Sequence, residues 1–260
     1  MKKIFLFILI AAMLCTALIS CNNQKSDLAA VEEAGKLVVG VTVYPPMDYL
    51  DENSEWTGFD AELAKMFAKE LGVNCQLVII PWSNKVAELD GRQIDLVWNG
   101  MTATEELGEQ IDFSVSYAKN AQVAVVKKGS AVTVDTVKDA TIAVENGSAG
   151  ATVAEETIKG TKINKVTAMS DALNEVLAGT SEVAIIDITM AQSVVGKGEY
   201  EGLEILEGAS YGDEIFAVGL RKDSDLKAKL DEFLKAKYAD GTLAALAEKY
   251  QVGLNTDALK

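Results

Sequence analysis

The feature that most constrains the fold is a repeated alternation of short apolar runs with amphipathic, helix-forming segments. From residue 37 the chain reads LVVGVTVYPP, a β-branched apolar run that ends at prolines, which predicts a buried strand and then a turn. The segment 58–72 spaces its leucine, methionine and phenylalanine residues as a helix does, with Asp60 able to cap its start and a glycine at its end. Further strands are expected at 76–80 and 94–98. This alternation predicts an α/β lobe on a mostly parallel sheet.

A second series of the same kind begins after residue 120 and predicts a second α/β lobe with its own core. Its expected elements are, in chain order, strands at 121–126 and 141–144, a helix at 171–178, a strand at 183–186 and a helix through 192. Two amphipathic helices, about 225–238 and 242–251, close the chain. In open parallel sheets ligands bind beyond the carboxyl ends of the strands, so a cleft between the lobes is the expected site.

The first twenty residues have the pattern of an export signal. Lys2 and Lys3 precede an apolar run that is shorter than the roughly 20 residues needed to span a membrane. A small residue followed by Cys21 resembles a bacterial lipobox, so we expect residues 1–20 to be removed and Cys21 to be lipidated. The polar segment 21–35 would then be a lipidated tether. A retained transmembrane anchor is the alternative.

Composition excludes several classes of function. The net charge of −15 argues against nucleic acid as a partner, because phosphate binding needs clustered lysine and arginine, and it favours a monomer. The chain contains no histidine, which excludes histidine triads and histidine-ligated zinc. Once Cys15 is removed and Cys21 lipidated, only Cys75 remains, and its apolar surroundings predict a packing role. We therefore expect no internal disulfide, no metal and no cofactor.

Seven segments occur along the chain in a recognisable order. They are YPPMDYLDE, WTGFDAELAKMFAKELG, DGRQIDLVWNGMTATEE, IDFSVSYAKNAQVAVV, VENGSAG, VAIID and FAVGLRKDSDL. Together they resemble the extracellular solute-binding proteins, family 3, that serve polar amino-acid ABC importers in bacteria. The resemblance implies a two-lobed α/β fold of the type II periplasmic-binding-protein kind, with two hinge strands near 118–123 and 210–216. Lobe 1 would comprise 36–119 plus 214–260, and lobe 2 would comprise 120–213.

The resemblance also implies the residues that bind a ligand. Tyr44 and Trp82 match aromatic residues that pack on the ligand, and both could offer a cation–π contact to a cationic ligand. Asn99, Gly100 and Thr102 match a segment that donates and accepts hydrogen bonds, in which Gly100 also permits close approach of the backbone. Ordinary core packing and a strand-end turn are the structural alternatives for these five residues.

Two further matches lie in the second lobe. Gly147, Ser148 and Ala149 match a glycine turn at the start of a helix, where backbone amides attract a carboxylate. Asp187 matches the carboxylate that holds the ammonium of the ligand. Ser148 and Asp187 could instead cap the helices that follow them.

At one position the chain departs from the family pattern. Family members commonly carry an arginine that grips the ligand α-carboxylate, and Leu107 stands at that position here. The only two arginines, Arg92 and Arg221, are both expected to be exposed. Either the carboxylate is held by the amides at 147–149 with a lysine such as Lys85 nearby, or the ligand has no α-carboxylate. Lys85 follows Trp82 on a short helix, where a solvated surface lysine is the usual case.

The leading interpretation is a lipid-anchored receptor outside the cytoplasmic membrane. It would capture an amino acid or a related amine-bearing solute between two closing lobes and present it to an ABC permease, without catalysis. One alternative is a lyase that resembles cyclohexadienyl dehydratase, for which Glu145 is the one acid to nominate besides Asp187. A ligand-sensing ectodomain is another.

Overall fold

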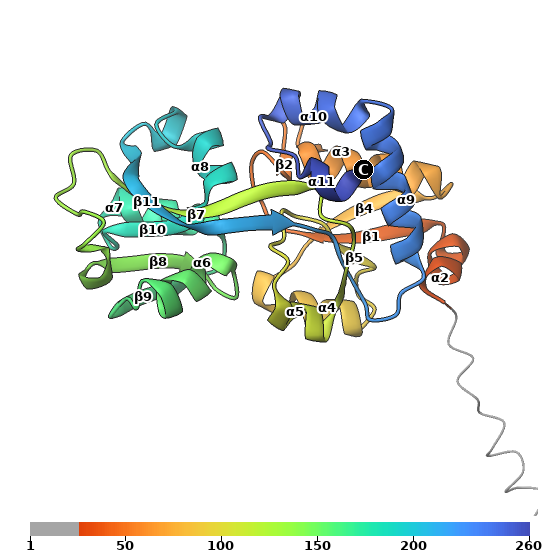
Figure 1. Cartoon of the computed structure of the whole chain (residues 1–260), viewed down its shortest axis with the longest axis horizontal. Helices are drawn as coiled ribbons and strands as arrows, with labels where there is room; N and C mark the ends of the chain where they lie inside the picture. The colour runs from red at the N-terminus through yellow and green to blue at the C-terminus, as the bar shows by residue number, and fades with distance from the viewer. Residues whose placement is uncertain (1–25) are drawn as a thin grey trace, which may run out of the picture.

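The computed structural model describes residues 26–260, which form two α/β lobes side by side (Figure 1). The predicted two-lobed α/β architecture is confirmed. The export segment and the lipidation site Cys21 lie outside the described residues, so the predictions made for them stay predictions. In the described part, no helix combines the length and the apolar character needed to cross a membrane.

Lobe 1, as we call the part on the right of Figure 1, is built on a five-stranded sheet. β1 (Lys36–Val41) pairs in parallel with β4 (Asn74–Ile79) on one side and with β5 (Leu96–Val97) on the other. β12 (Gly219–Leu220) and β6 (Asp112–Phe113) complete the sheet with antiparallel pairs. The late strand β12 shows that the chain returns to lobe 1 after building lobe 2.

Helices and one short hairpin surround this sheet. They are α2 (Asp27–Ala34), the hairpin of β2 (Tyr49–Leu50) and β3 (Trp56–Thr57), α3 (Phe59–Glu70), α4 (Lys85–Asp90), α5 (Glu105–Gln110), α9 (Leu226–Ala239), α10 (Thr242–Tyr250) and α11 (Thr256–Leu259). The predicted inner face of α3 is confirmed, because Leu63 and Phe67 are buried. The predicted cap is wrong: Asp60 makes no capping bond but accepts hydrogen bonds from the Gly100 amide (2.7 Å) and the Tyr117 hydroxyl (2.8 Å).

Lobe 2 is built on a second five-stranded sheet in the order β11-β7-β10-β8-β9. Its strands are β7 (Ala118–Lys127), β8 (Thr141–Glu145), β9 (Lys162–Val166), β10 (Val183–Asp187) and β11 (Leu203–Phe216). Its helices include α6 (Ala149–Thr152), α7 (Met169–Ala178) and α8 (Ile188–Val194). β8, β9 and β10 are parallel to one another, whereas β7 runs antiparallel to both of its neighbours. The carboxyl ends of β8 and β10 therefore lie at one edge of the sheet.

Two long antiparallel strands, β7 and β11, run from lobe 2 into lobe 1 (Figure 1). Where they enter lobe 1, Ala118 pairs with Phe216, Ala118 also forms a bridge with Leu254, and Phe216 forms one with Thr102. These strands occupy the place predicted for the hinge. The exact lobe boundaries, 119/120 and 213/214, stay predictions.

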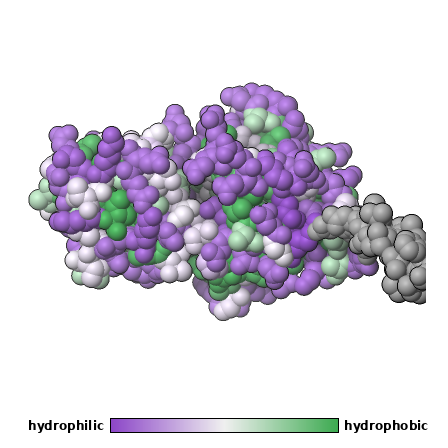
Figure 2. All heavy atoms as spheres, turned by 90° about the horizontal axis from the view of Figure 1, so that it is seen from below, coloured by the Kyte–Doolittle hydropathy of each residue, from purple (hydrophilic) through white to green (hydrophobic). Residues whose placement is uncertain are grey.

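An aromatic centre in lobe 1 fixes the end of β5. The ring of Trp98 lies 6.3 Å from that of Phe67 and 6.5 Å from that of Phe233, and all three side chains are buried. Cys75 is half-buried against the same core, and burial raises the pKa of its thiol to about 11, which fits the predicted packing role. The surface in Figure 2 is mostly hydrophilic, as the high charge of the chain requires.

Candidate functional site

A cavity of about 380 Å³ lies between the lobes, where strand ends of both sheets face each other. Lobe 1 contributes the loops that follow β1 and β5 and the start of α4, and lobe 2 contributes the ends of β8 and β10 and the start of α6. All nine residues predicted to bind a ligand line it: Tyr44, Trp82, Asn99, Gly100, Thr102, Gly147, Ser148, Ala149 and Asp187. The structure thus brings the predicted residues together in one cleft of a size suited to a small solute.

The side chain of Asn99 holds the loop after β1 in place. Its Oδ1 accepts from the amide (3.0 Å) and the hydroxyl (2.7 Å) of Thr42. Its Nδ2 donates to the Thr42 carbonyl oxygen (3.0 Å) and to Oδ2 of Asp48 (2.7 Å). Because both ends of the amide group are engaged within lobe 1, this side chain positions the wall of the cleft.

Gly100 allows Tyr44 to lie against the backbone. Gly100 has φ +54°, and a Cβ there would lie 2.6 Å from the Tyr44 ring and 3.2 Å from the Phe216 ring. Only glycine adopts this backbone conformation readily while leaving that space open. Next to it, the Thr102 hydroxyl donates to Oε2 of Glu214 (3.0 Å).

Asp187 ends β10 and is buried at the base of the cleft. Its Oδ1 accepts from Nδ2 of Asn120 (2.8 Å) and from Nε2 of Gln122, and it makes no cap to α8. The same two amides donate to Oε2 of Glu214, at 2.8 and 3.0 Å. Burial and the nearby charge of Glu214 raise the pKa of Asp187 to about 7. Two acids therefore share neutral donors, and no ion pair within residues 26–260 neutralises Asp187.

Asn120, Gln122 and Glu214 did not emerge from the sequence analysis as site residues. They lie on the strands β7 and β11, which connect the lobes. A signal was present, because an asparagine and a glutamine interrupt the apolar run AKNAQVAVV at alternate positions and so share one strand face.

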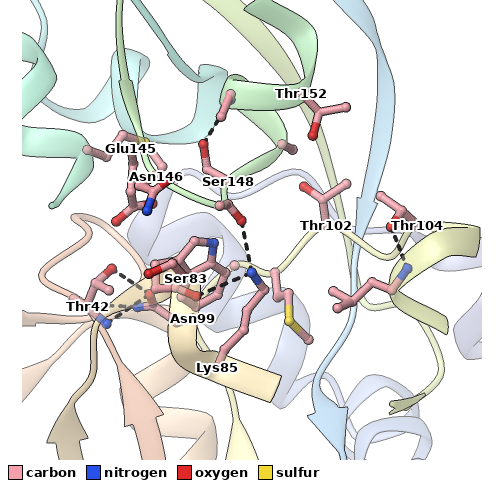
Figure 3. Close-up of a pocket in the computed structure, with 18 of the residues that line it drawn as sticks. Thr42, Ser83, Lys85, Asn99, Thr102, Thr104, Glu145, Asn146, Ser148 and Thr152 are labelled. Atoms are coloured by element: carbon pink, nitrogen blue, oxygen red, sulfur yellow. Dashed lines mark hydrogen bonds between the residues drawn. The ribbon is translucent and has the colours of Figure 1, made fainter. Parts of the chain in front are cut away.

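Glu145 ends β8 and is the second buried acid that lines the cleft (Figure 3). Its side chain is 2% exposed, and Oε1 has no hydrogen-bond partner in the described part of the chain. Burial and the charge of Asp187 raise the pKa of Glu145 to about 8, although Lys85 and the Met169 amide favour the ionised form. The sequence analysis considered this residue only as a catalytic acid.

Lys85 spans the two lobes, and its predicted exposure is wrong. It is buried, and its Nζ donates to the carbonyl oxygens of Gly147 (2.9 Å) and Trp82 (3.3 Å). The same ammonium lies 4.9 Å from the centre of the Trp82 ring, which is itself buried. Figure 3 shows Lys85 reaching from α4 towards the turn that carries Ser148. A buried cation thus lines the same cavity as the buried acids Asp187 and Glu145.

The glycine turn of lobe 2 touches lobe 1 directly. Gly147 has φ +75°, and a Cβ there would lie 2.9 Å from the Cα of Ser83. The Ser148 hydroxyl accepts from the Ala151 amide (3.1 Å), so it caps α6, which was the structural alternative for this residue.

No arginine reaches the cleft. Leu107 lines the cavity near the start of α5, where the family pattern has an arginine. The prediction that Arg221 is exposed is wrong: it is buried, pairs with Asp27 (3.0 Å) and donates to the Ile94 carbonyl oxygen (2.6 Å). Arg92 is exposed, as predicted, and also pairs with Asp27 (2.7 Å). In residues 26–260 no group of three or more cysteine, aspartate or glutamate side chains is placed to hold a metal ion.

The comparison with known families decides which class of protein builds this cleft. The family model described as bacterial extracellular solute-binding proteins, family 3, matches residues 37–253. The chain belongs to this family. This solute-binding protein is therefore the extracytoplasmic, ligand-capturing component of an ABC importer for amino acids or related solutes.

Relatives extend over nearly the whole of this solute-binding protein. It is 31% identical to the arginine-binding extracellular protein ArtP of Bacillus subtilis, over 97% of this chain and 99% of that one. It is 29% identical to the L-cystine-binding protein TcyJ of Escherichia coli, over 86% and 85% of the two chains.

Solved structures with the same fold include a mutant of the arginine-binding protein ArgBP from T. maritima, with a TM-score of 0.80 at 30% identity, covering 86% of this chain and 98% of that one. An ancestral amino acid-binding protein, described as a precursor of cyclohexadienyl dehydratase, has a TM-score of 0.79 at 29% identity, covering 86% and 99%.

Proposed function

We propose that the mature protein is anchored to the cell membrane through a lipid on Cys21, captures an amino acid in the cleft and presents it to an ABC permease. The observation that carries the assignment of the ligand is Asp187, a buried acid in the cavity without a cationic partner among the described residues. A ligand ammonium would supply that partner and hold Asp187 ionised. The names of relatives that bind arginine and cystine support an amino acid as the ligand.

Two lysines line the cavity, and because Lys165 pairs with Glu155 (2.7 Å), Lys85 is the candidate cation for the ligand carboxylate. Lys85 reaches the cleft from α4, and the backbone at Gly147 to Ala149 lines the cavity beside it. Because Leu107 can supply neither charge nor hydrogen bonds, these groups would replace the arginine of other family members. The remaining alternative is a ligand without an α-carboxylate.

We propose that closure of the lobes on the ligand, rather than chemistry, is the working step. β7 and β11 are the connections that would bend, and the ligand stabilises the closed state by its differential affinity. The relatives named above are binding proteins, which supports the absence of catalysis. Incubation of the purified protein with prephenate tests the lyase alternative, and turnover that depends on Glu145 would establish it.

A thermal-shift screen tests the ligand class. The panel holds the twenty amino acids, citrulline, polyamines, betaines and decarboxylated analogues such as agmatine. A ligand at about 100 times its dissociation constant adds about 2.7 kcal/mol to the free energy of unfolding. We expect a clear shift with at least one amino acid and a smaller one with its decarboxylated analogue. Shifts with amines alone would establish the carboxylate-free alternative.

Asp187→Asn then tests the ammonium site with the amino acid found. Removing one partner of a buried ion pair costs about 3 to 5 kcal/mol, so the dissociation constant should rise by roughly two to four decades. Asp257→Asn, which changes an exposed side chain of α11, is the matched control and should bind as the wild type does. An unchanged affinity in Asp187→Asn would contradict the assignment.

A further inference from the structure

We propose that Glu145 forms a second cation-binding subsite in the cleft, so that the protein selects amino acids with a cationic side chain. The inference rests on the proposed function, because it places the ligand ammonium at Asp187. It adds a role for a residue that the ammonium site does not use.

The position of Glu145 follows from the register of the sheet. β8 and β10 are parallel neighbours in which Ala143 pairs with Ala184, so Glu145 and Asp187 leave the sheet at the same edge. Both side chains line the cavity and both are buried. The cleft therefore presents two acidic side chains from neighbouring strands, and a ligand ammonium at Asp187 would pair with only one of them.

Glu145 is only half satisfied, because it accepts a hydrogen bond from the Met169 amide at the start of α7 but its second oxygen has no partner among the described residues. Its Oε1 makes no hydrogen bond within residues 26–260, although an unpaired buried polar atom is costly. The groups that face it are Asp187, Asp171, Lys85 and the Met169 amide. Lys85 donates instead to the carbonyl oxygens of Gly147 and Trp82. A buried, unpartnered acceptor on a residue that lines a ligand cavity points to a donor that arrives with the ligand when the lobes close on it.

The chemistry of that donor follows from charge. Burial raises the pKa of Glu145 to about 8, so near neutral pH the empty cleft keeps this acid largely protonated. A guanidinium or ammonium beside Oε1 would favour the ionised form and release the proton. A neutral polar side chain would gain only an uncharged hydrogen bond. A basic side chain such as that of arginine or lysine therefore fits the subsite.

The experiment is isothermal titration of arginine and of citrulline, which has the same shape but a neutral ureido group in place of the guanidinium. We compare the wild type, Glu145→Gln and Glu156→Gln, an exposed glutamate of the same lobe, as the matched control. We expect the wild type and the control to bind arginine at least about 10-fold more tightly than citrulline. In Glu145→Gln, arginine affinity should fall by about 10- to 100-fold and citrulline affinity should change little.

Two further readouts separate this subsite from a purely structural role. Titration at pH 7 in two buffers of different ionisation enthalpy should show that arginine releases protons, and that Glu145→Gln releases fewer. The ligand-free variant should unfold at no lower temperature than the wild type, because it loses an unpaired buried acid. If Glu145→Gln fails to fold, the ratio of the wild-type affinities for arginine and citrulline still tests whether the cleft selects a cationic side chain.

Three outcomes would overturn the inference. They are an unchanged arginine affinity in Glu145→Gln, an equal affinity of the wild type for arginine and citrulline, and binding of neutral amino acids only. Each of these leaves the proposed capture of an amino acid standing. A protein that binds no amino acid at all would overturn both proposals.

Discussion

Replacing Gly147 with alanine should weaken ligand binding by blocking closure where the two lobes touch. The new Cβ would lie 2.9 Å from the Cα and 3.2 Å from the Cβ of Ser83, in the opposite lobe. Ordinary van der Waals contact begins at 3.4 Å, and the closer atom is backbone, which cannot rotate away. The lobes must therefore move apart, which also stretches the bond from Lys85 to the Gly147 carbonyl oxygen.

The free-energy cost of Gly147→Ala has two parts, one that lowers the stability of the fold and one that opposes closure of the lobes. A left-handed backbone costs a residue with a Cβ about 1 to 2 kcal/mol, whether the cleft is open or closed. Overpacking of a close contact costs about 1 to 3 kcal/mol and falls on the closed state alone. We expect the second part to raise the dissociation constant by about 5- to 150-fold.

Gly129→Ala is the matched control. Gly129 also has φ +75°, but a Cβ there would meet no atom within 4 Å. Both variants should lose similar stability in thermal denaturation, whereas only Gly147→Ala should lose affinity for arginine in calorimetric titration. Small-angle scattering should show a smaller ligand-induced decrease in the radius of gyration for Gly147→Ala. Wild-type affinity and compaction in Gly147→Ala would refute the idea that this contact limits closure.

Three other predictions concern ligand affinity against pH, stability against pH and the membrane anchor. Affinity for arginine should fall as the pH decreases from about 8 to 6, because protons then compete with the cationic groups of the ligand for Glu145 and Asp187. The pKa values of these two acids in the empty cleft are about 8 and about 7. An affinity that does not change with pH would contradict this prediction. The stability of the ligand-free protein should show the opposite trend. Folding raises the pKa of Glu145 from 4.5 to about 8 and that of Asp187 from 3.8 to about 7, so the native state binds more protons than the unfolded state. These two acids therefore lower the free energy of unfolding as the pH rises from about 4 to 8. Thermal denaturation across that range should give a shallower decline for Glu145→Gln than for the wild type. Cys21→Ala should appear in the culture medium on fractionation, and its retention in the membrane would show that residues 1–20 stay as an anchor.

Sequence reasoning located the cleft because strand ends can be read locally. Asn99 and Asp187 each follow an apolar β-branched run, and parallel strands bring their carboxyl ends to one edge of a sheet. Gly100 and Gly147 mark positions of positive φ, which the sequence indicates through glycine alone. These features depend on neighbours within a few residues and were enough to place the cleft, whereas the roles of the individual residues came from the resemblance to a family of known fold.

The errors concern side chains whose partners lie far away in the sequence. Arg221 is buried because it pairs with Asp27, 194 residues earlier, and nothing near it in the chain signals that partner. Lys85 is buried because Gly147, 62 residues later, comes to rest against it when the lobes meet. Asp60 supports the Gly100 amide instead of capping its own helix. Short-range propensity cannot anticipate such contacts, because they form only once the whole fold is in place.

Charge matching distinguishes the ligand classes that the absence of a cleft arginine leaves open. Of the other charged residues that line the cavity, Lys165 pairs with Glu155 and Glu106 is exposed. Asp187 and Glu145 call for two cations and Lys85 calls for one anion, so a basic amino acid pairs the three buried charged groups of the lining. A neutral amino acid leaves Glu145 without a charged partner, and a diamine without a carboxylate leaves Lys85 without one. Citrulline leaves Glu145 protonated and gains no ion pair there, and agmatine leaves the ammonium of Lys85 without an anion, so arginine should bind more tightly than both. Agmatine binding as tightly as arginine would show that Lys85 holds the lobes together without contacting the ligand.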